Sequence, residues 1–152
     1  MTYDIVVEQV PAELIAAVRV VIPVGQVARA WKPALDQVWS YLKANPDLRP
    51  GHNLFLYRDP VHRGDLIEAD FGVQVARRFE PAGAVRCVET PAGEVVRAVH
   101  VGAYDRRGEA HAAIQAWCAA HGRTIGVASW ETYGHWTDDP AQLETTITYL
   151  LA

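Results

Sequence analysis

An internal repeat runs through this sequence, because the same order of predicted elements occurs in both halves. Runs of apolar and β-branched residues predict strands, and apolar residues at a spacing of three to four predict helices. Read in this way, each half has the order strand, helix, strand, strand. We therefore expect a fold that is built from two copies of one small unit.

Individual residues support the repeat when the two halves are placed in register. Tyr41-Leu42-Lys43-Ala44 lies 76 positions before Trp117-Cys118-Ala119-Ala120. At the same offset of 76, Phe55-Leu56-Tyr57 lies over Glu131-Thr132-Tyr133. A single register from the helix into the following strand indicates a duplication.

The repeat predicts an α+β fold with pseudo-two-fold symmetry, in which antiparallel sheets carry two helices. We expect one domain over residues 1–152, with a first module at about 1–80 and a second at about 81–152. The helices are expected to begin near Gln26 and near Asp105. Strands are expected at residues 5–10, 13–24, 53–58, 65–76, 85–89, 94–101, 127–136 and 143–151.

Composition excludes several classes of function. Half of the 152 residues are hydrophobic and 21% are charged, which is typical of one soluble globular domain. The net charge is −4, and the pairs Arg77-Arg78 and Arg106-Arg107 are too short to form a basic nucleic-acid surface. We therefore expect no direct binding of nucleic acid.

The cysteines and the ends of the chain predict a simple cytoplasmic protein. Cys87 and Cys118 fit no Cys-x-x-Cys or Cys/His spacing, so we expect free thiols in a reducing compartment rather than zinc. The first residues have no charged segment followed by an apolar run, so we expect no signal peptide, and no apolar stretch reaches membrane-spanning length. We accordingly expect a cytoplasmic location, no membrane association, no metal and no cofactor.

The segment Ser129–Trp136 holds the strongest candidate for a site residue. Its aromatic and β-branched residues, followed by turn residues, predict a strand. Alternation then places Glu131 and Tyr133 on one face, and Trp130 and Trp136 on the other. A carboxylate among aromatic rings is costly to bury unless a cation, a hydrogen-bond donor or a substrate pairs with it. Glu131 is thus either a solvent-facing residue of an edge strand or part of a site.

Pseudo-two-fold packing would bring the matching strands of the two modules to one shared cleft. That cleft would hold Phe55, Tyr57 and Tyr133 together with a single acid, Glu131. Such an arrangement is typical of a site that recognises small molecules. The alternative for each aromatic residue is an ordinary place in the core.

Three more aromatic residues are candidates for the ligand-binding site. Phe71 lies beside Gly72, where a ligand could approach closely, although glycine within a strand more often marks a bulge. Tyr104 could reach the cleft or simply pack against the helix that follows it. Trp39 lies on the first predicted helix, where a core position and a cleft position are equally open.

The histidines give no catalytic or metal-binding pattern. His111 and His121 are ten positions apart on a helix and so fall on different faces. His135 shares the face of Glu131 and could tune the rim of a cleft, and His100 is expected to be structural. No His-Glu-x-x-His motif, Ser-His-Asp order or phosphate-binding loop is present in the sequence.

Four segments of the chain resemble the GyrI-like effector-binding domains, which occur in multidrug-sensing transcription regulators and as stand-alone proteins. Together the segments span nearly the whole chain, and it is their order and spacing that carry the resemblance. They are Pro91-Ala92-Gly93 running into residues 98–104, Glu68-Ala69-Asp70-Phe71-Gly72-Val73, Trp130-Glu131-Thr132-Tyr133, and Leu143-Glu144-Thr145-Thr146-Ile147.

The resemblance implies a tandem of strand-helix-strand-strand modules, which agrees with the repeat. It also implies that Glu131 lies in an aromatic pocket that attracts lipophilic cations. Some stand-alone relatives are hydrolases of cyclopropane-containing cytotoxic compounds, which would make Glu131 a catalytic carboxylate. Others inhibit DNA gyrase, which would imply a protein partner. Because strand-like residues begin at Ile5, with no helix-turn-helix before them, we expect no DNA-reading regulator.

Overall fold

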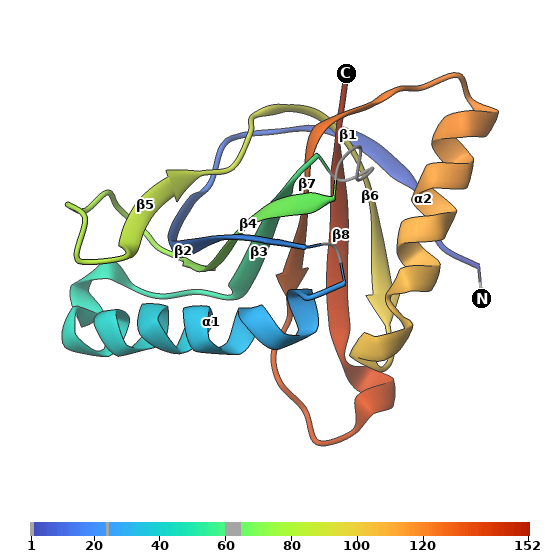
Figure 1. Ribbon diagram of the computed structural model, residues 1–152. Helices are drawn as coiled ribbons and strands as arrows, with labels where there is room; N and C mark the ends of the chain where they lie inside the picture. Colours follow the sequence, from blue (N-terminus) through green and yellow to red (C-terminus); the bar gives the residue numbers. More distant parts are fainter. Residues whose placement is uncertain (1, 24, 60–64) are drawn as a thin grey trace.

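One antiparallel sheet forms the framework of the protein. A computed structural model describes residues 2–23, 25–59 and 65–152, and within these residues the eight strands have the order β1-β6-β8-β7-β3-β4-β2-β5 (Figure 1). The strands are β1 (Val6–Val10), β2 (Leu14–Pro23), β3 (Asn53–Arg58), β4 (Leu66–Gln74), β5 (Val85–Glu89), β6 (Gly93–Val101), β7 (Ile125–Tyr133) and β8 (Glu144–Leu151). The two helices are α1 (Val27–Ala44) and α2 (Gly108–Ala120).

The strand order confirms the duplicated α+β architecture. The first unit is β2-α1-β3-β4 and the second is β6-α2-β7-β8, and their strands mirror each other about the centre of the sheet. Each half gains one more edge strand, which is β5 beside β2 and β1 beside β6. Strand β5 precedes the second unit in the chain but pairs with a strand of the first unit. Strand β1 precedes the first unit but pairs with a strand of the second unit.

The pseudo-two-fold axis passes through the pairing of β3 with β7. Phe55 lies directly opposite Glu131 in this antiparallel pair, and the same two residues are 76 positions apart in the repeat. A residue that faces its own repeat equivalent must lie at the symmetry axis. The helices keep the same register, since α1 ends at Ala44 and α2 ends at Ala120.

Both helices pack on one face of the sheet, and each covers the outer strands of its own unit. Helix α1 turns Ala34, Leu35, Val38 and Leu42 inward, at the spacing that places them on one side of a helix. These residues pack with apolar side chains of β2 and β4, whereas α2 packs with β6 and β8. The central strands β3 and β7 therefore lie between the two helices (Figure 1).

The opposite face of the sheet has a core of its own. Trp130 is buried there with Leu54 and Leu56, as alternation along β7 and β3 predicts. Val10 near one edge of the sheet and Val88 near the other pack against this same cluster. The two ends of the sheet therefore curve toward each other on the face without helices.

Two element boundaries differ from the sequence expectation. Strand β7 ends at Tyr133, so Trp136 no longer follows the alternation and is 72% exposed. Helix α2 begins at Gly108, after a short 3₁₀ turn at Tyr104–Arg106, rather than near Asp105. Among the described residues, no helix combines the length and the apolar character needed to cross a membrane.

Candidate functional site

A cavity of about 750 Å³ lies between α1 and the centre of the sheet. Its walls come from both units, because α1, β3, the end of β7 and the turn before α2 all contribute side chains. Aromatic rings predominate in this lining. The rings are those of Trp31, Trp39, Phe55, Tyr57, Tyr104, Tyr133 and Trp136, with the imidazoles of His52 and His135.

The aromatic rings contact one another and so hold the shape of the wall. The ring of Tyr133 lies edge-on to Phe55 and to Tyr104, with centroids 5.0 Å and 5.4 Å away. The ring of Trp31 from α1 lies 6.1 Å from that of Phe55, within the range of distances found for aromatic pairs. Trp39 is fixed separately, because its Nε1 donates to Asn53 Oδ1 at 2.9 Å.

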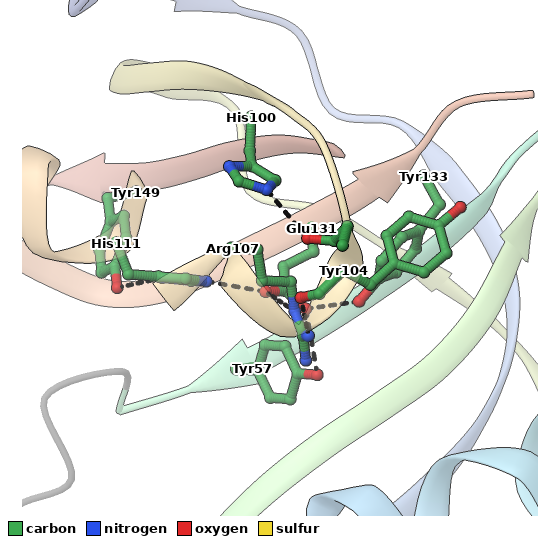
Figure 2. Close-up of polar contacts among 9 residues, drawn as sticks. Tyr57, His100, Tyr104, Arg107, His111, Glu131, Tyr133 and Tyr149 are labelled. Carbon is green, nitrogen blue, oxygen red and sulfur yellow. Dashed lines mark hydrogen bonds and ion pairs between the residues drawn. The ribbon is translucent and has the colours of Figure 1, made fainter. Parts of the chain in front are cut away.

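Glu131 lies beneath this wall with its carboxylate fully paired. It is only 3% exposed. Its Oε1 accepts hydrogen bonds from the Tyr133 hydroxyl at 2.6 Å and the Tyr57 hydroxyl at 3.4 Å. Its Oε2 accepts from Arg107 Nε at 3.0 Å and lies 2.7 Å from His111 Nε2. Figure 2 shows these four side chains converging on the carboxylate from β3, β7, α2 and the residue just before α2.

The partners of Glu131 decide its charge. Burial raises the pKa of the carboxyl group, but the His111 hydrogen bond, the Arg107 charge and the Tyr133 hydroxyl together outweigh burial and lower that pKa to about 2. Glu131 is therefore a carboxylate at every physiological pH. Burial, followed by the nearby charge of Glu131, raises the pKa of Tyr57 and of Tyr133, so both phenols remain protonated donors.

Within the second unit, a line of hydrogen bonds runs from Glu131 on β7 through α2 to β8. His111 Nδ1 lies 2.7 Å from the hydroxyl of Tyr149, and Gln115 Nε2 donates to the same hydroxyl at 3.2 Å. These groups line a smaller cavity of about 310 Å³, which also contains Glu131 and Arg107. The contact with Tyr149 holds the imidazole of His111 in place, so its Nε2 stays directed at Glu131 as a hydrogen-bond donor.

Arg107 lies where the two cavities meet. Its side chain lines both of them and is 33% exposed. Besides the bond to Glu131, its Nη1 donates to the carbonyl oxygen of Tyr104 at 2.6 Å. Arg107 is the only Arg, Lys, Asp or Glu residue among the described residues that line the larger cavity. The charge that borders this cavity is thus a guanidinium with a carboxylate directly behind it.

The structure brings most of the predicted site residues together. Phe55, Tyr57, Tyr104, Tyr133 and Trp39 line the larger cavity, and Glu131 lines the smaller one that adjoins it.

Phe71 lies elsewhere than the sequence suggested. It is fully buried behind the wall, with its ring centroid 4.9 Å from that of Phe55, and it does not line the cavity. Its neighbour Gly72 admits the backbone of β2 rather than a ligand, since an added Cβ would lie 2.6 Å from the carbonyl oxygen of Ala16. Phe71 therefore supports the wall from behind.

Sequence reasoning missed the two basic partners of Glu131. Arg107 was considered only for nucleic-acid binding and His111 only for its spacing from His121. The repeat offset of 76 contains the missing signal, because it places Arg107 over Trp31 and His111 over Leu35 on the inner side of α1. No group of three or more His, Cys, Asp or Glu side chains able to hold a metal occurs among the described residues.

The family described as the GyrI-like small molecule binding domain matches residues 3–150. No curated protein sequence matches the chain.

Solved structures share the fold. The C-terminal domain of EcmrR superimposes with a TM-score of 0.82 at 22% identity, covering 100% of this chain and 99% of that one. In an EcmrR–DNA complex, this chain covers 57% of the longer EcmrR chain. A hydrolase from Listeria innocua has a TM-score of 0.64 at 13% identity, with 97% and 91% of the two chains covered. SAV2435 bound to tetraphenylphosphonium has a TM-score of 0.64 at 11% identity, with 100% and 94% covered.

Proposed function

The chain belongs to the GyrI-like small molecule binding domain family, and on this premise we propose that it binds lipophilic aromatic molecules that carry a positive charge. The observation that carries the proposal is the contact between an aromatic cavity and a buried carboxylate. Tyr57 and Tyr133 line the cavity with their rings and donate their hydroxyls to Glu131.

The size and lining of the cavity suit an aromatic ligand. A volume of about 750 Å³ lies within the range of sites for drug-sized molecules. Rings from Trp31, Phe55 and Tyr104 offer apolar faces on several sides, so a ligand with several aromatic groups would lose most of its contact with water. Apolar surface exceeds polar surface in the lining of the cavity, which favours lipophilic over strongly hydrated ligands.

Electrostatics favour a positive charge on that ligand. The faces of aromatic rings attract cations by about 0.5–2 kcal/mol for each contact. A phenol that donates its proton to a carboxylate becomes more electron-rich, so Glu131 strengthens this attraction through Tyr57 and Tyr133. A fold relative, SAV2435, has been solved with the lipophilic cation tetraphenylphosphonium. That compound is accordingly a suitable probe for this chain.

Titration with tetraphenylphosphonium tests the proposal. Tryptophan fluorescence should report saturable binding to the wild type, and Glu131→Gln should weaken binding about tenfold or more because the buried charge is lost. The control is Glu144→Gln, which removes the same charge from an exposed position outside both cavities. Equal affinities for the wild type and Glu131→Gln would reject the proposed role of the carboxylate.

Hydrolysis of cyclopropane-containing compounds is the alternative function, and the geometry gives it less support. A general base needs a free lone pair and a pKa near the working pH. Both oxygens of Glu131 already have two partners each, and the pKa is about 2. We therefore place ligand binding first. An interaction with DNA gyrase stays a prediction from the family resemblance.

A further inference from the structure

We propose that Arg107 is a specificity-determining residue: it is a resident cation that a ligand must displace from Glu131. The inference rests on the proposed function and concerns how the same site selects its ligands. In this account the guanidinium occupies the place of the ligand's positive charge while the site is empty. Only a molecule that replaces this charge gains full access to the carboxylate.

The contacts of Arg107 place it between the ligand cavity and the acid. Its Nε holds Glu131 Oε2 at 3.0 Å, and its side chain lines both the 750 Å³ and the 310 Å³ cavities. A third of the side chain is exposed, whereas Glu131 is almost fully buried. A ligand in the larger cavity therefore meets the guanidinium before it meets the carboxylate.

The first unit shows what this position contains when no charge is involved. Trp31 is the repeat equivalent of Arg107, and Phe55 is the equivalent of Glu131. Trp31 packs on Phe55 across 6.1 Å as an aromatic pair. A partly buried ion pair often adds no more stability than apolar residues of similar volume, because its charges lose their hydration. The aromatic pair of the first unit would therefore stabilise the fold as well as the Arg107–Glu131 ion pair does.

The local backbone also differs between the two units. Arg107 follows the 3₁₀ turn Tyr104–Arg106 and precedes the regular helix α2. Helix α1, by contrast, begins at Val27, so residues 28–30, the repeat equivalents of that turn, lie within the regular helix. Arg107 donates one hydrogen bond to the carboxylate of Glu131 and another to the backbone carbonyl oxygen of Tyr104 in the turn. Arg107 lines both cavities together with Val27 and Tyr57, which places it at the boundary between them.

Exchange of one cation for another keeps the buried carboxylate paired. A lipophilic cation can replace the guanidinium without leaving Glu131 unpaired, which would be costly in a buried site. A neutral molecule of the same shape would have to bind over the intact pair or break it without compensation. If a ligand binds only to a state that few molecules occupy, its apparent affinity is reduced by the fraction of molecules in that state. Arg107 thus lowers affinity for every ligand but least for cations.

The test measures tetraphenylphosphonium affinity for the wild type, Arg107→Ala and the matched control Arg106→Ala, at pH 8. Arg106 is the preceding residue, forms an exposed pair with Glu109 and lines neither cavity, so its loss changes the net charge equally. We expect Arg107→Ala to bind about tenfold tighter than the wild type, which is within the usual range of coupling between sites. Arg106→Ala should bind as the wild type does.

Guanidinium chloride provides a second readout. At millimolar concentration, guanidinium should refill the vacated place in Arg107→Ala and weaken tetraphenylphosphonium binding, whereas sodium chloride at the same concentration should not. If Arg107→Ala does not fold, Arg107→Gln replaces it, because the amide can still donate to Glu131 without a charge.

The outcomes separate this inference from the proposed function. Equal or weaker binding by the Arg107 variant, with the wild type still binding, would overturn the role of Arg107 alone. No binding by the wild type or any variant would overturn the proposed function as well. In the double variant Arg107→Ala/Glu131→Gln, the gain in affinity should disappear, because a neutral amide replaces the carboxylate that the guanidinium shielded.

Discussion

Arg107 occupies in the second unit the place that Trp31 occupies in the first. The two residues are 76 positions apart, and each packs against the central strand of its own unit. Both units contribute to the larger cavity, but at these equivalent positions the first unit has an aromatic pair and the second has a charged pair. This asymmetry distinguishes the centre of the site from an ordinary apolar core.

Acid should destabilise the wild type through Glu131. Its pKa is about 2 in the folded protein against an ordinary 4.5, so its carboxylate form stabilises the fold above pH 4.5. That stabilisation is lost as the pH falls from 4.5 toward 2, and it amounts to about 3 kcal/mol by linkage. Urea unfolding between pH 6 and pH 2.5 measures it. Arg107, His111, Tyr57 and Tyr133 are the groups that face this carboxylate.

In the same experiment, Glu131→Gln should show a shallower loss of unfolding free energy at acid pH. Glu144→Gln, which lies at an exposed position, should follow the wild type. An unchanged acid slope in Glu131→Gln would mean that other carboxyl groups account for the acid sensitivity.

The two tyrosines that bond to Glu131 should contribute unequally to stability. Tyr133→Phe removes a 2.6 Å hydrogen bond to a charged acceptor and should cost about 1.5–3 kcal/mol of unfolding free energy. Tyr57→Phe removes a longer contact of 3.4 Å and should cost about 0.5 kcal/mol. Chemical denaturation of both variants provides the comparison. A larger cost for Tyr57→Phe would contradict the geometry of the site.

Tryptophan substitutions should locate the bound ligand. Trp31 lines the cavity, so Trp31→Phe should remove a large share of the fluorescence change caused by tetraphenylphosphonium. Trp117 lies on α2, stacks on His121 and does not line the cavity, so Trp117→Phe should retain the change. If Trp117→Phe abolished the signal and Trp31→Phe kept it, the ligand would lie elsewhere.

Phe55 and Phe71 should separate ligand contact from support of the wall. Phe55→Leu shortens a side chain that lines the cavity and should weaken tetraphenylphosphonium binding about threefold to tenfold. Phe71→Leu alters a buried side chain behind the wall, so it should lower stability by about 1 kcal/mol with little change in affinity. Binding titrations and urea unfolding of both variants test this difference.

The sequence alone predicted the architecture and the gathering of several aromatic residues at the candidate site. A period of two along the strands places Phe55 and Tyr57 on one face, and the register of the repeat adds Glu131 and Tyr133. These relationships depend on local geometry and on one offset, so they can be read from a single chain. The same register also relates Arg107 to Trp31, which lines the cavity in the first unit.

Other features depend on packing between distant segments. His111 faces Glu131 and Tyr149 because of where α2 lies on the sheet, which the spacing of histidines along a helix cannot show. Phe71 was misplaced for the same reason: alternation gives its face, but the neighbouring ring of Phe55 decides whether it reaches the cavity. The charge of Glu131 likewise follows from partners that come from three different elements.

Two ions of equal shape and opposite charge show whether the cavity prefers a cation. Tetraphenylphosphonium and tetraphenylborate have the same four phenyl groups, so the ratio of their affinities isolates the charge that the site prefers. We expect the wild type to prefer the phosphonium by at least about tenfold, and Glu131→Gln to show a much smaller preference. Equal affinities for the two ions in the wild type, or a preference for the borate, would contradict the proposed binding of cations.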